Sequence, residues 1–209
     1  MPRIEPFERY PFKYDQWFIR NKYAYISELL AIKKQLPKSK NGVEIGVGSG
    51  RFAAPLGIRL GVEPSSKMRM LSKKRMIDLI DSIAENLPFR SSIFDFALMV
   101  TTICFIDDIE RTFKEIFKIL KPEGIFIIGF IDRNSAIGKL YEQHKESNVF
   151  YNIADFYSVE KVISFLSKTK FKNFNFSQTI FHPLLAINKI EQVKKGYGKG
   201  SFVVIKAKK

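Results

Sequence analysis

One short stretch combines a buried strand with a glycine-rich turn: VEIGVGSG, residues 43–50. Its first half reads as a strand covered on both faces. The glycines that follow let the backbone turn tightly and approach a ligand that a Cβ atom would exclude. The helix expected next would point its free N–H groups into the same space. The stretch therefore predicts a strand, a turn and a helix N-terminus around a small-molecule site.

Outward from this stretch, short apolar runs alternate with helix-like segments. Further strands are expected at residues 60–63, 76–80, 94–100 and 125–131, and a helix at 108–120. Residues 171–181 and 200–208 are rich in β-forming residues, with no clear helix between them, so they could pair antiparallel at the sheet edge. The pattern predicts an α/β fold: a Rossmann-like, doubly wound sheet of seven strands, mostly parallel, with a C-terminal antiparallel pair.

The composition is globular, with an excess of positive charge that lies in the two flanks. The formal net charge is +14, of which residues 1–40 carry +5 and residues 138–209 carry +8. Lysine pairs such as Lys33-Lys34 lack the interleaved arginine and aromatic residues that stack on bases. We interpret the flanks as solvated faces, and a nucleic-acid surface is possible but less favoured.

Several protein classes do not fit this chain. The single cysteine, Cys104, excludes an intramolecular disulfide framework, and two histidines leave little material for a metal site. The N-terminus has charges throughout and no secretory signal. The longest strongly apolar run, Ile125–Ile131, is far below the ~20 residues of a membrane helix. We expect a soluble, cytoplasmic protein with no bound metal and no membrane insertion.

An acidic residue follows the glycine turn at a spacing typical of ribose binding. Glu63 comes 17 residues after Gly46, at the end of the second expected strand, where a carboxylate can accept hydrogen bonds from both ribose hydroxyls. Capping of the next helix is the alternative role. The dinucleotide pattern G-x-G-x-x-G would need a third glycine at Arg51, whereas this turn reads G-x-G-x-G. A dehydrogenase is therefore the weakest reading.

The glycine pattern closely resembles the first motif of class I S-adenosylmethionine-dependent methyltransferases. The resemblance continues through ordered motifs of the small-molecule, ubiquinone/menaquinone-methyltransferase-like branch: GVEPS at 61–65, AENLPF at 84–89, FDFA at 94–97 and LKPEG at 120–124. It covers roughly residues 40–132. Two positions depart from the family pattern: Ile83 stands where an acidic residue is frequent, and Glu123 stands where glycine is common.

The resemblance implies S-adenosylmethionine as the cofactor and a role for each matching residue. Gly46 and Gly48 would back its methionine part, with Glu44 near the ammonium group. Glu63 would hold the ribose, and the backbone of Ala84 and Glu85 would meet the adenine edge. Thr101 and Thr102 would line the methyl end. Gly50 and Pro64 complete the expected cofactor-binding set.

The expected reaction needs little from the protein beyond alignment. A methyl sulfonium is already a good electrophile, so positioning of the acceptor in line with the methyl group is the main requirement. A base is needed only for an acceptor that arrives protonated. The weak catalytic candidates are Asp132, Tyr141, His144 and Tyr14, and each also has an ordinary structural reading.

The whole chain, 1–209, is expected to form a single methyltransferase domain. Residues 41–132 would be the cofactor-binding core, and residues 133–209 the substrate-side segment and C-terminal strands. Residues 1–40 would be an N-terminal helical lid, because residues 10–25 hold seven aromatics, four of them on one helical face. A helix packed on the sheet is the alternative for that face.

The predicted function is in-line transfer of a methyl group to a small-molecule acceptor, an amine or a hydroxyl. RNA or protein methylation using the basic flanks is the alternative, and a third reading is a binding protein that has lost catalysis. The fourth expected strand ends in Thr101-Thr102-Ile103-Cys104, unlike the Asn/Asp-Pro-Pro-aromatic end of base-amine methylases. The acceptor, the methylated atom and the oligomeric state are left open.

Overall fold

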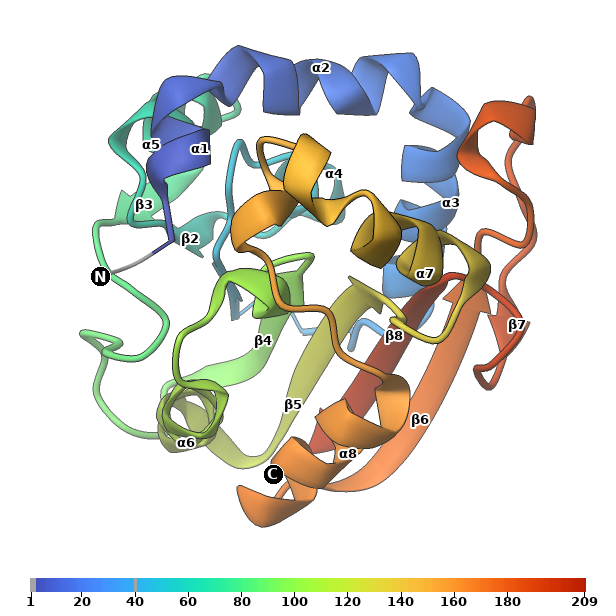
Figure 1. The fold of residues 1–209 in the computed structure, drawn as a ribbon. Coiled ribbons are helices and arrows are strands. Elements are labelled where there is room, and N and C mark those ends of the chain that lie inside the picture. The colour runs from blue at the N-terminus through green and yellow to red at the C-terminus, as the bar shows by residue number, and fades with distance from the viewer. Residues whose placement is uncertain (1–2, 40) are drawn as a thin grey trace.

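A twisted eight-stranded sheet forms the centre of the molecule (Figure 1). The structure, a computed structural model, describes residues 3–39 and 41–209. The strand order is β3-β2-β1-β4-β5-β8-β6-β7. The strands are β1 Gly42–Ile45, β2 Leu60–Val62, β3 Asp78–Ile80, β4 Phe94–Val100, β5 Leu120–Ile131, β6 Lys172–Thr179, β7 Lys194–Lys195 and β8 Phe202–Lys208.

The predicted fold class is confirmed, with one additional strand. Strands β3 to β5 pair in parallel through β2, β1 and β4. Strand β8 inserts between β5 and β6 and runs antiparallel to both, so the two C-terminal strands do pair with each other. The eighth strand, β7, is only two residues long and adds to the outer edge of β6.

Two strand starts differ from the sequence prediction. Met76 has a positive φ of 58° and is exposed, so it belongs to the turn after a helix, and β3 begins at Asp78. The expected turn at residues 121–124 is an irregularity inside a longer β5, which pairs with β4 from Leu120 onward. Glu123 has a φ of 65° there, which is the conformation that explains the glycine common at this position.

Helices cover both faces of the sheet and one of its ends. They are α1 Glu5–Arg9, α2 Pro11–Arg20, α3 Lys22–Lys33, α4 Ala53–Leu56, α5 Ser66–Lys73, α6 Ile109–Ile119, α7 Ala136–Gln143 and α8 Val159–Lys168, with short 3₁₀ turns at η1 Ile103–Phe105, η2 Lys145–Ser147, η3 Tyr151–Ile153 and η4 Leu184–Ala186. The side chains of Ser65 and Asp108 cap α5 and α6 by accepting N–H groups, so these two helices begin where polar residues precede them. No helix in residues 3–39 and 41–209 is long and apolar enough to cross a membrane.

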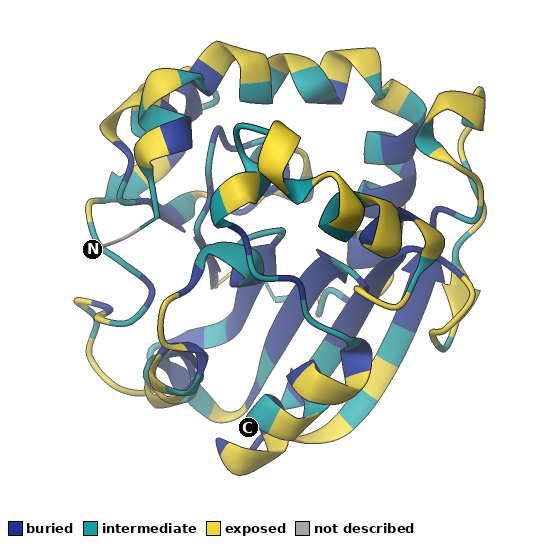
Figure 2. Ribbon diagram, viewed as in Figure 1, coloured by how far each residue is buried: buried dark blue, intermediate teal, exposed yellow. Residues whose placement is uncertain are grey.

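The core lies in two layers on either side of the sheet (Figure 2). On one face, Phe113 and Ile116 of α6 and Leu166 of α8 pack against strand residues such as Met99. On the other face, Ala31 and Ile32 of α3 pack against the alternate strand positions. This alternation follows from the two-residue period of a strand.

The N-terminal aromatic segment is divided between two helices. The helix is interrupted at Asn21, where the chain changes direction. Helix α3 therefore packs on β6 and β8, while α1 and α2 run across the end of the sheet where the parallel strands finish (Figure 1). Phe18 of α2 and Tyr25 of α3 still meet across the break, with ring centroids 5.2 Å apart. The segment therefore supplies both a helix on the sheet and two helices above the strand ends.

Candidate functional site

The turn after β1 is shaped by close backbone approach. Gly46 has a φ of +70°, and a Cβ atom there would overlap the side chain of Thr102. Thr102 follows β4, and its Oγ1 donates to the Gly46 carbonyl at 3.1 Å. Gly50, with a φ of +80°, faces the opposite way and packs against Ser72 of α5. The glycine pattern thus brings the ends of β1 and β4 together and seats the turn on α5.

Glu63 at the end of β2 holds this turn from the other side. Its two carboxylate oxygens accept backbone N–H groups of Gly48 and Ser65, each at 2.9 Å. Burial raises the pKa of Glu63 to about 7, although both N–H groups favour the charged form. Each oxygen keeps a second lone pair for another donor.

A cavity of about 80 Å³ lies between the turn, Glu63 and the loop after β3. Every expected cofactor residue except Glu44 and Gly50 lines this cavity, and so do Arg3, Ile4 and Phe7 from the N-terminus. The predicted residues that line it are Gly46, Gly48, Glu63, Pro64, Ala84, Glu85, Thr101 and Thr102. Residues from four strand ends, far apart in sequence, therefore share one small space.

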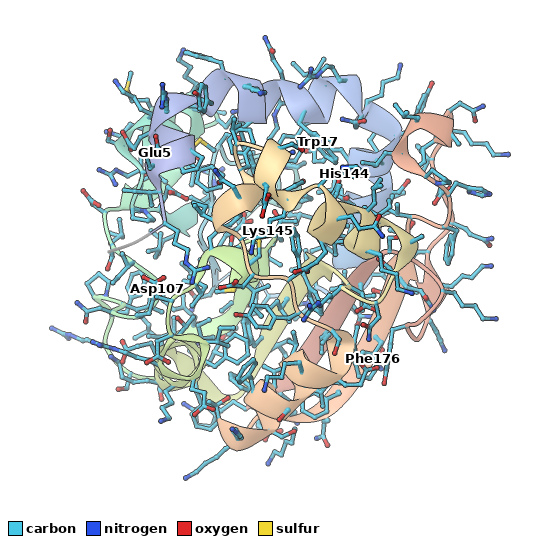
Figure 3. The ribbon with its side chains drawn as sticks, in the orientation of Figure 1. Glu5, Trp17, Asp107, His144, Lys145 and Phe176 are labelled. Atoms are coloured by element: carbon cyan, nitrogen blue, oxygen red, sulfur yellow. The ribbon has the colours of Figure 1, made fainter. Side chains whose placement is uncertain are left out.

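A second cavity, of about 360 Å³, adjoins the first. Tyr14, Thr101 and Phe105 line both cavities. Thr101 has a φ of 50°, a left-handed conformation that costs a residue with a side chain about 1–3 kcal/mol and is concentrated at functional sites. The walls of the second cavity are largely aromatic, and Figure 3 places Trp17 of α2 on the side that faces the segment carrying His144 and Lys145.

The comparisons with known proteins assign the chain that forms these two cavities to a family. Residues 43–128 match the family model of the methyltransferase domain. The chain is also 48% identical to a solved S-adenosylmethionine-dependent methyltransferase of Thermotoga maritima, described as a possible histamine N-methyltransferase; the match covers 99% of each chain, with a TM-score of 0.96. The chain belongs to the class I S-adenosylmethionine-dependent methyltransferases.

Further relatives of this methyltransferase are found at lower identity. An uncharacterised protein of Methanocaldococcus jannaschii is 43% identical over 203 residues, which is 97% of this chain and 98% of that protein. A ubiquinone/menaquinone biosynthesis C-methyltransferase of Rickettsia typhi is 27% identical over 157 residues, or 58% of this chain and 63% of that protein.

The methyltransferase uses S-adenosylmethionine as its cofactor, and the first cavity fits that group chemically. Glu63 faces it with unused lone pairs, and Gly48 borders it with no side chain. Glu44 lies behind the turn with its Oε2 atom buried and unpaired. Burial raises the pKa of Glu44 well above the usual range, although a hydrogen bond from the backbone N–H of Ala53 acts to lower it.

The four catalytic candidates of the methyltransferase separate into two pairs. Tyr14 and Tyr141 line the second cavity, and burial raises the pKa of Tyr14 well above 10 and that of Tyr141 to about 12, so both stay protonated phenols. Asp132 lines neither of the two cavities; its carboxylate accepts the N–H of Asn134 at 3.1 Å and holds the turn after β5. His144 caps the end of α7 and is exposed. Asp132 therefore stabilises a turn, and His144 ends a helix.

Two other polar residues take structural roles. Burial raises the pKa of the Cys104 thiol to about 12, so Cys104 is an inert wall residue of the second cavity. Asp15 of α2 accepts Arg51 at 2.6 and 2.8 Å and Arg75 at 2.9 and 3.1 Å. Arg51, the residue at the third-glycine position, therefore ties α2 to the glycine turn. Within residues 3–39 and 41–209, no cluster of three acidic, histidine or cysteine side chains is arranged to hold a metal.

One cavity residue of the methyltransferase was not anticipated from sequence. Glu28 of α3 is only 4% exposed and lines the second cavity. A signal for it existed: Glu28 lies one helical turn after Ala24 and one before Ala31 and Ile32, which are all buried. A single charged residue on an apolar helical face is either paired inside the protein or part of a ligand site. The sequence does not distinguish the two cases, because the distinction depends on which residues surround the side chain in the fold.

Proposed function

We propose that this methyltransferase acts on a small-molecule acceptor, an amine or a hydroxyl compound, which binds in the 360 Å³ cavity. The observation that carries the proposal is the shared wall: Tyr14, Thr101 and Phe105 border both cavities, so a molecule in the second meets the methionine end of the first. A volume of ~300–1,000 Å³ is typical of small-molecule sites.

Within the first cavity, we assign each end of the cofactor by the groups that border it. Glu63 takes the ribose hydroxyls, because its free lone pairs face the cavity. The Glu85 side chain accepts the N–H of Asp107 at 3.0 Å, which leaves the backbone of Ala84 and Glu85 for the adenine edge. Ile83 makes this end apolar where relatives carry an acid. Gly46 and Gly48 back the methionine part, with Glu44 beneath it.

Helices α1 and α2 act as a lid in this proposal. The first cavity is smaller than the ~300 Å³ expected of a ligand site, and the Tyr14 ring lies 3.8 Å from where a Gly48 Cβ would stand. Entry of the cofactor then requires α1 and Tyr14 to move outward, with the Asp15–Arg51 pair as the latch. Closure excludes water from the reacting atoms.

The bound cofactor supplies an electrophilic methyl group, and the protein supplies alignment. Thr101, Tyr14 and Phe105 hold the acceptor's nucleophile against the methyl end, and proximity of this kind is worth an effective molarity of about 10⁵–10⁸ M. For an amine acceptor that arrives unprotonated, the proton stays on the methylated nitrogen and leaves to solvent once the lid opens. Asp132 and His144 have no part in this step, because neither lines the cavity.

Labelled methyl donor tests the acceptor class. The enzyme is incubated with cofactor carrying a labelled methyl group and a cell extract, which is then separated into metabolite, RNA and protein fractions. Label in the metabolite fraction, resistant to ribonuclease and protease, is the expected result. Label confined to RNA or protein would overturn the proposal and revive a role for the basic flanks. Calorimetric titration with S-adenosylhomocysteine, expected to bind in the micromolar range, checks the cofactor site separately.

A further inference from the structure

Glu28 is a buried carboxyl group that no other described residue partners. It is 4% exposed, and within residues 3–39 and 41–209 it accepts no hydrogen bond and forms no ion pair. By contrast, the buried carboxylates of Glu63 and Asp132 accept backbone N–H groups, and Glu44, whose Oε2 atom is also unpaired, lies outside the lining of the second cavity. A buried carboxyl group without a partner costs free energy whether it is neutral or charged, so its place at a cavity wall points to a ligand that supplies the missing partner.

The surroundings of Glu28 favour a cation. Among the described lining residues of the second cavity, Glu28 is the one acid. The aromatic rings of Trp17, Tyr141 and Tyr151 line the same space, and ring faces attract an organic cation. Burial raises the pKa of Glu28 to about 8, with no opposing partner. The basic residues of the wall, Lys13 and Arg20, are exposed on α2, and solvent screens them.

Glu28 also comes from a helix on the side of the sheet that lies away from the cofactor turn. Helix α3 packs on β6 and β8, whereas Thr101 follows β4. In the order β4-β5-β8-β6 three strand spacings of ~4.8 Å separate β4 from β6. A ligand that touches both ends must therefore be elongated, with its cationic group at one end and its reacting atom at the other.

We propose that Glu28 binds the protonated amine of the acceptor, which makes the substrate class small, elongated amines with an apolar or aromatic body. This inference rests on the proposed function, since it concerns the same cavity. The amine at Glu28 is the anchor, and a second group of the same molecule reaches the methyl end beside Thr101. Glu28 is thus a specificity-determining residue that sets which molecules lie correctly.

Matched pairs of probe molecules test the anchor. Phenethylamine, tyramine and tryptamine each have an alcohol counterpart of nearly the same shape: 2-phenylethanol, tyrosol and tryptophol. Calorimetric titration of the full-length protein at pH 7, with and without S-adenosylhomocysteine, gives a ratio of affinities for each pair. We expect at least one amine to bind about tenfold or more tightly than its alcohol. Ratios below about twofold for every pair would overturn the proposal.

Two variants locate the preference. Glu28→Gln keeps the shape and hydrogen-bonding capacity of the neutral side chain, so it should fold, and its amine-to-alcohol ratio should fall to about one. Glu146→Gln makes the same side-chain replacement at an exposed position of η2 and should keep the wild-type ratio. An amine preference that persists in Glu28→Gln contradicts the assignment.

Proton release separates binding at Glu28 from a structural role. Because Glu28 is largely protonated at pH 7, pairing with an ammonium group must release a proton, and the binding enthalpy of the amine should vary with the ionisation enthalpy of the buffer. The neighbouring phenols Tyr141 and Tyr151 stay protonated at this pH and do not contribute. Glu28→Gln should show no such dependence, and release that persists there contradicts the proposal. Failure of S-adenosylhomocysteine to bind would count against the cofactor site alone, since the amine ratio is also measured without it.

Discussion

The two cavities of this methyltransferase are built in different ways. The cofactor cavity is bordered by the backbone of a glycine turn and by a carboxylate that already holds two N–H groups. The adjoining cavity is made of side chains, mostly aromatic, with one carboxyl group that has no described partner. Backbone geometry recognises a fixed ligand, whereas a side-chain wall can be altered without disturbing the fold. The contrast suggests that the first cavity keeps the cofactor constant and the second sets the acceptor.

The largest expected effect comes from the backbone-built cavity. In Gly46→Ala the added Cβ would overlap Thr102 and the positive φ would be strained, so we expect about 3 kcal/mol lower unfolding free energy and loss of S-adenosylhomocysteine binding. Gly57→Ala is the control, because Gly57 has a φ of +74° but open space around it. Urea denaturation and calorimetry measure both variants. Equal behaviour of the two would mean that contact with Thr102 does not shape the turn.

The next effect concerns the ribose assignment. Glu63→Ala should weaken S-adenosylhomocysteine binding by about 1.5–3 kcal/mol, the loss expected for hydrogen bonds to a charged group. Asp81→Ala, which removes an exposed partner of Arg69 near the end of β3, should bind as the wild type does. Calorimetry compares the two dissociation constants. Unchanged affinity in Glu63→Ala would refute the role of Glu63.

The side-chain cavity should respond in stability rather than in cofactor binding. The pKa of Glu28 is raised to about 8 in the folded chain, so between about pH 4.5 and 8 the native state binds more protons than the unfolded state, and stability falls as pH rises. Glu28→Gln removes this loss while Glu44 and Glu63 remain in both proteins. We expect the variant to gain stability over the wild type as pH rises from 5 to 9, by at most about 4 kcal/mol. A difference that stays constant with pH would exclude a raised pKa at Glu28.

The smallest effect is expected at Asp15 of α2, which pairs with Arg51 of the glycine turn. Burial opposes ionisation, but the hydrogen bonds of Arg51, Ser49 and Arg75 lower the pKa of Asp15 to about 2. Its contribution is therefore present above pH 4 and lost as pH falls through 2. Asp15→Asn should lower the unfolding free energy by about 1 kcal/mol at pH 7 and speed S-adenosylhomocysteine release.

A variant of a second aspartate serves as the control for the Asp15–Arg51 pair. Asp95 pairs with Lys121 away from both cavities, so Asp95→Asn should leave the release rate of S-adenosylhomocysteine unchanged. Stopped-flow displacement measures the rate in both proteins. An unchanged rate in Asp15→Asn would show that α2 is not a latch.

The same contrast explains which features were predictable. The strands, helix α6 and the glycine turn with Glu63 follow from patterns within about 20 residues of one another: apolar runs, an N-cap residue and glycine spacing. The resemblance to a known family supplied the other residues of the cofactor cavity, such as Ala84 and Thr101. Strand β4 occupies its expected residues, 94–100. The bounds of β3 and β5 shifted because a positive φ at Met76 and Glu123 is a property of the folded chain. Likewise, the contacts of Asp132 and His144 depend on the folded chain and are not given by the sequence.

The sequence by itself determined the sheet, the glycine turn and the acidic residue that follows it, since each depends on local spacing and on the periods of strands and helices. Only the tertiary structure decided that Gly50 packs on α5, that Arg51 pairs with Asp15, and that Glu28 stands unpaired at the wall of an aromatic cavity. Burial and pairing depend on segments more than a hundred residues apart meeting in space, as α3 meets β6 and β8. For that reason the cofactor could be inferred from motifs, and the acceptor site required the fold.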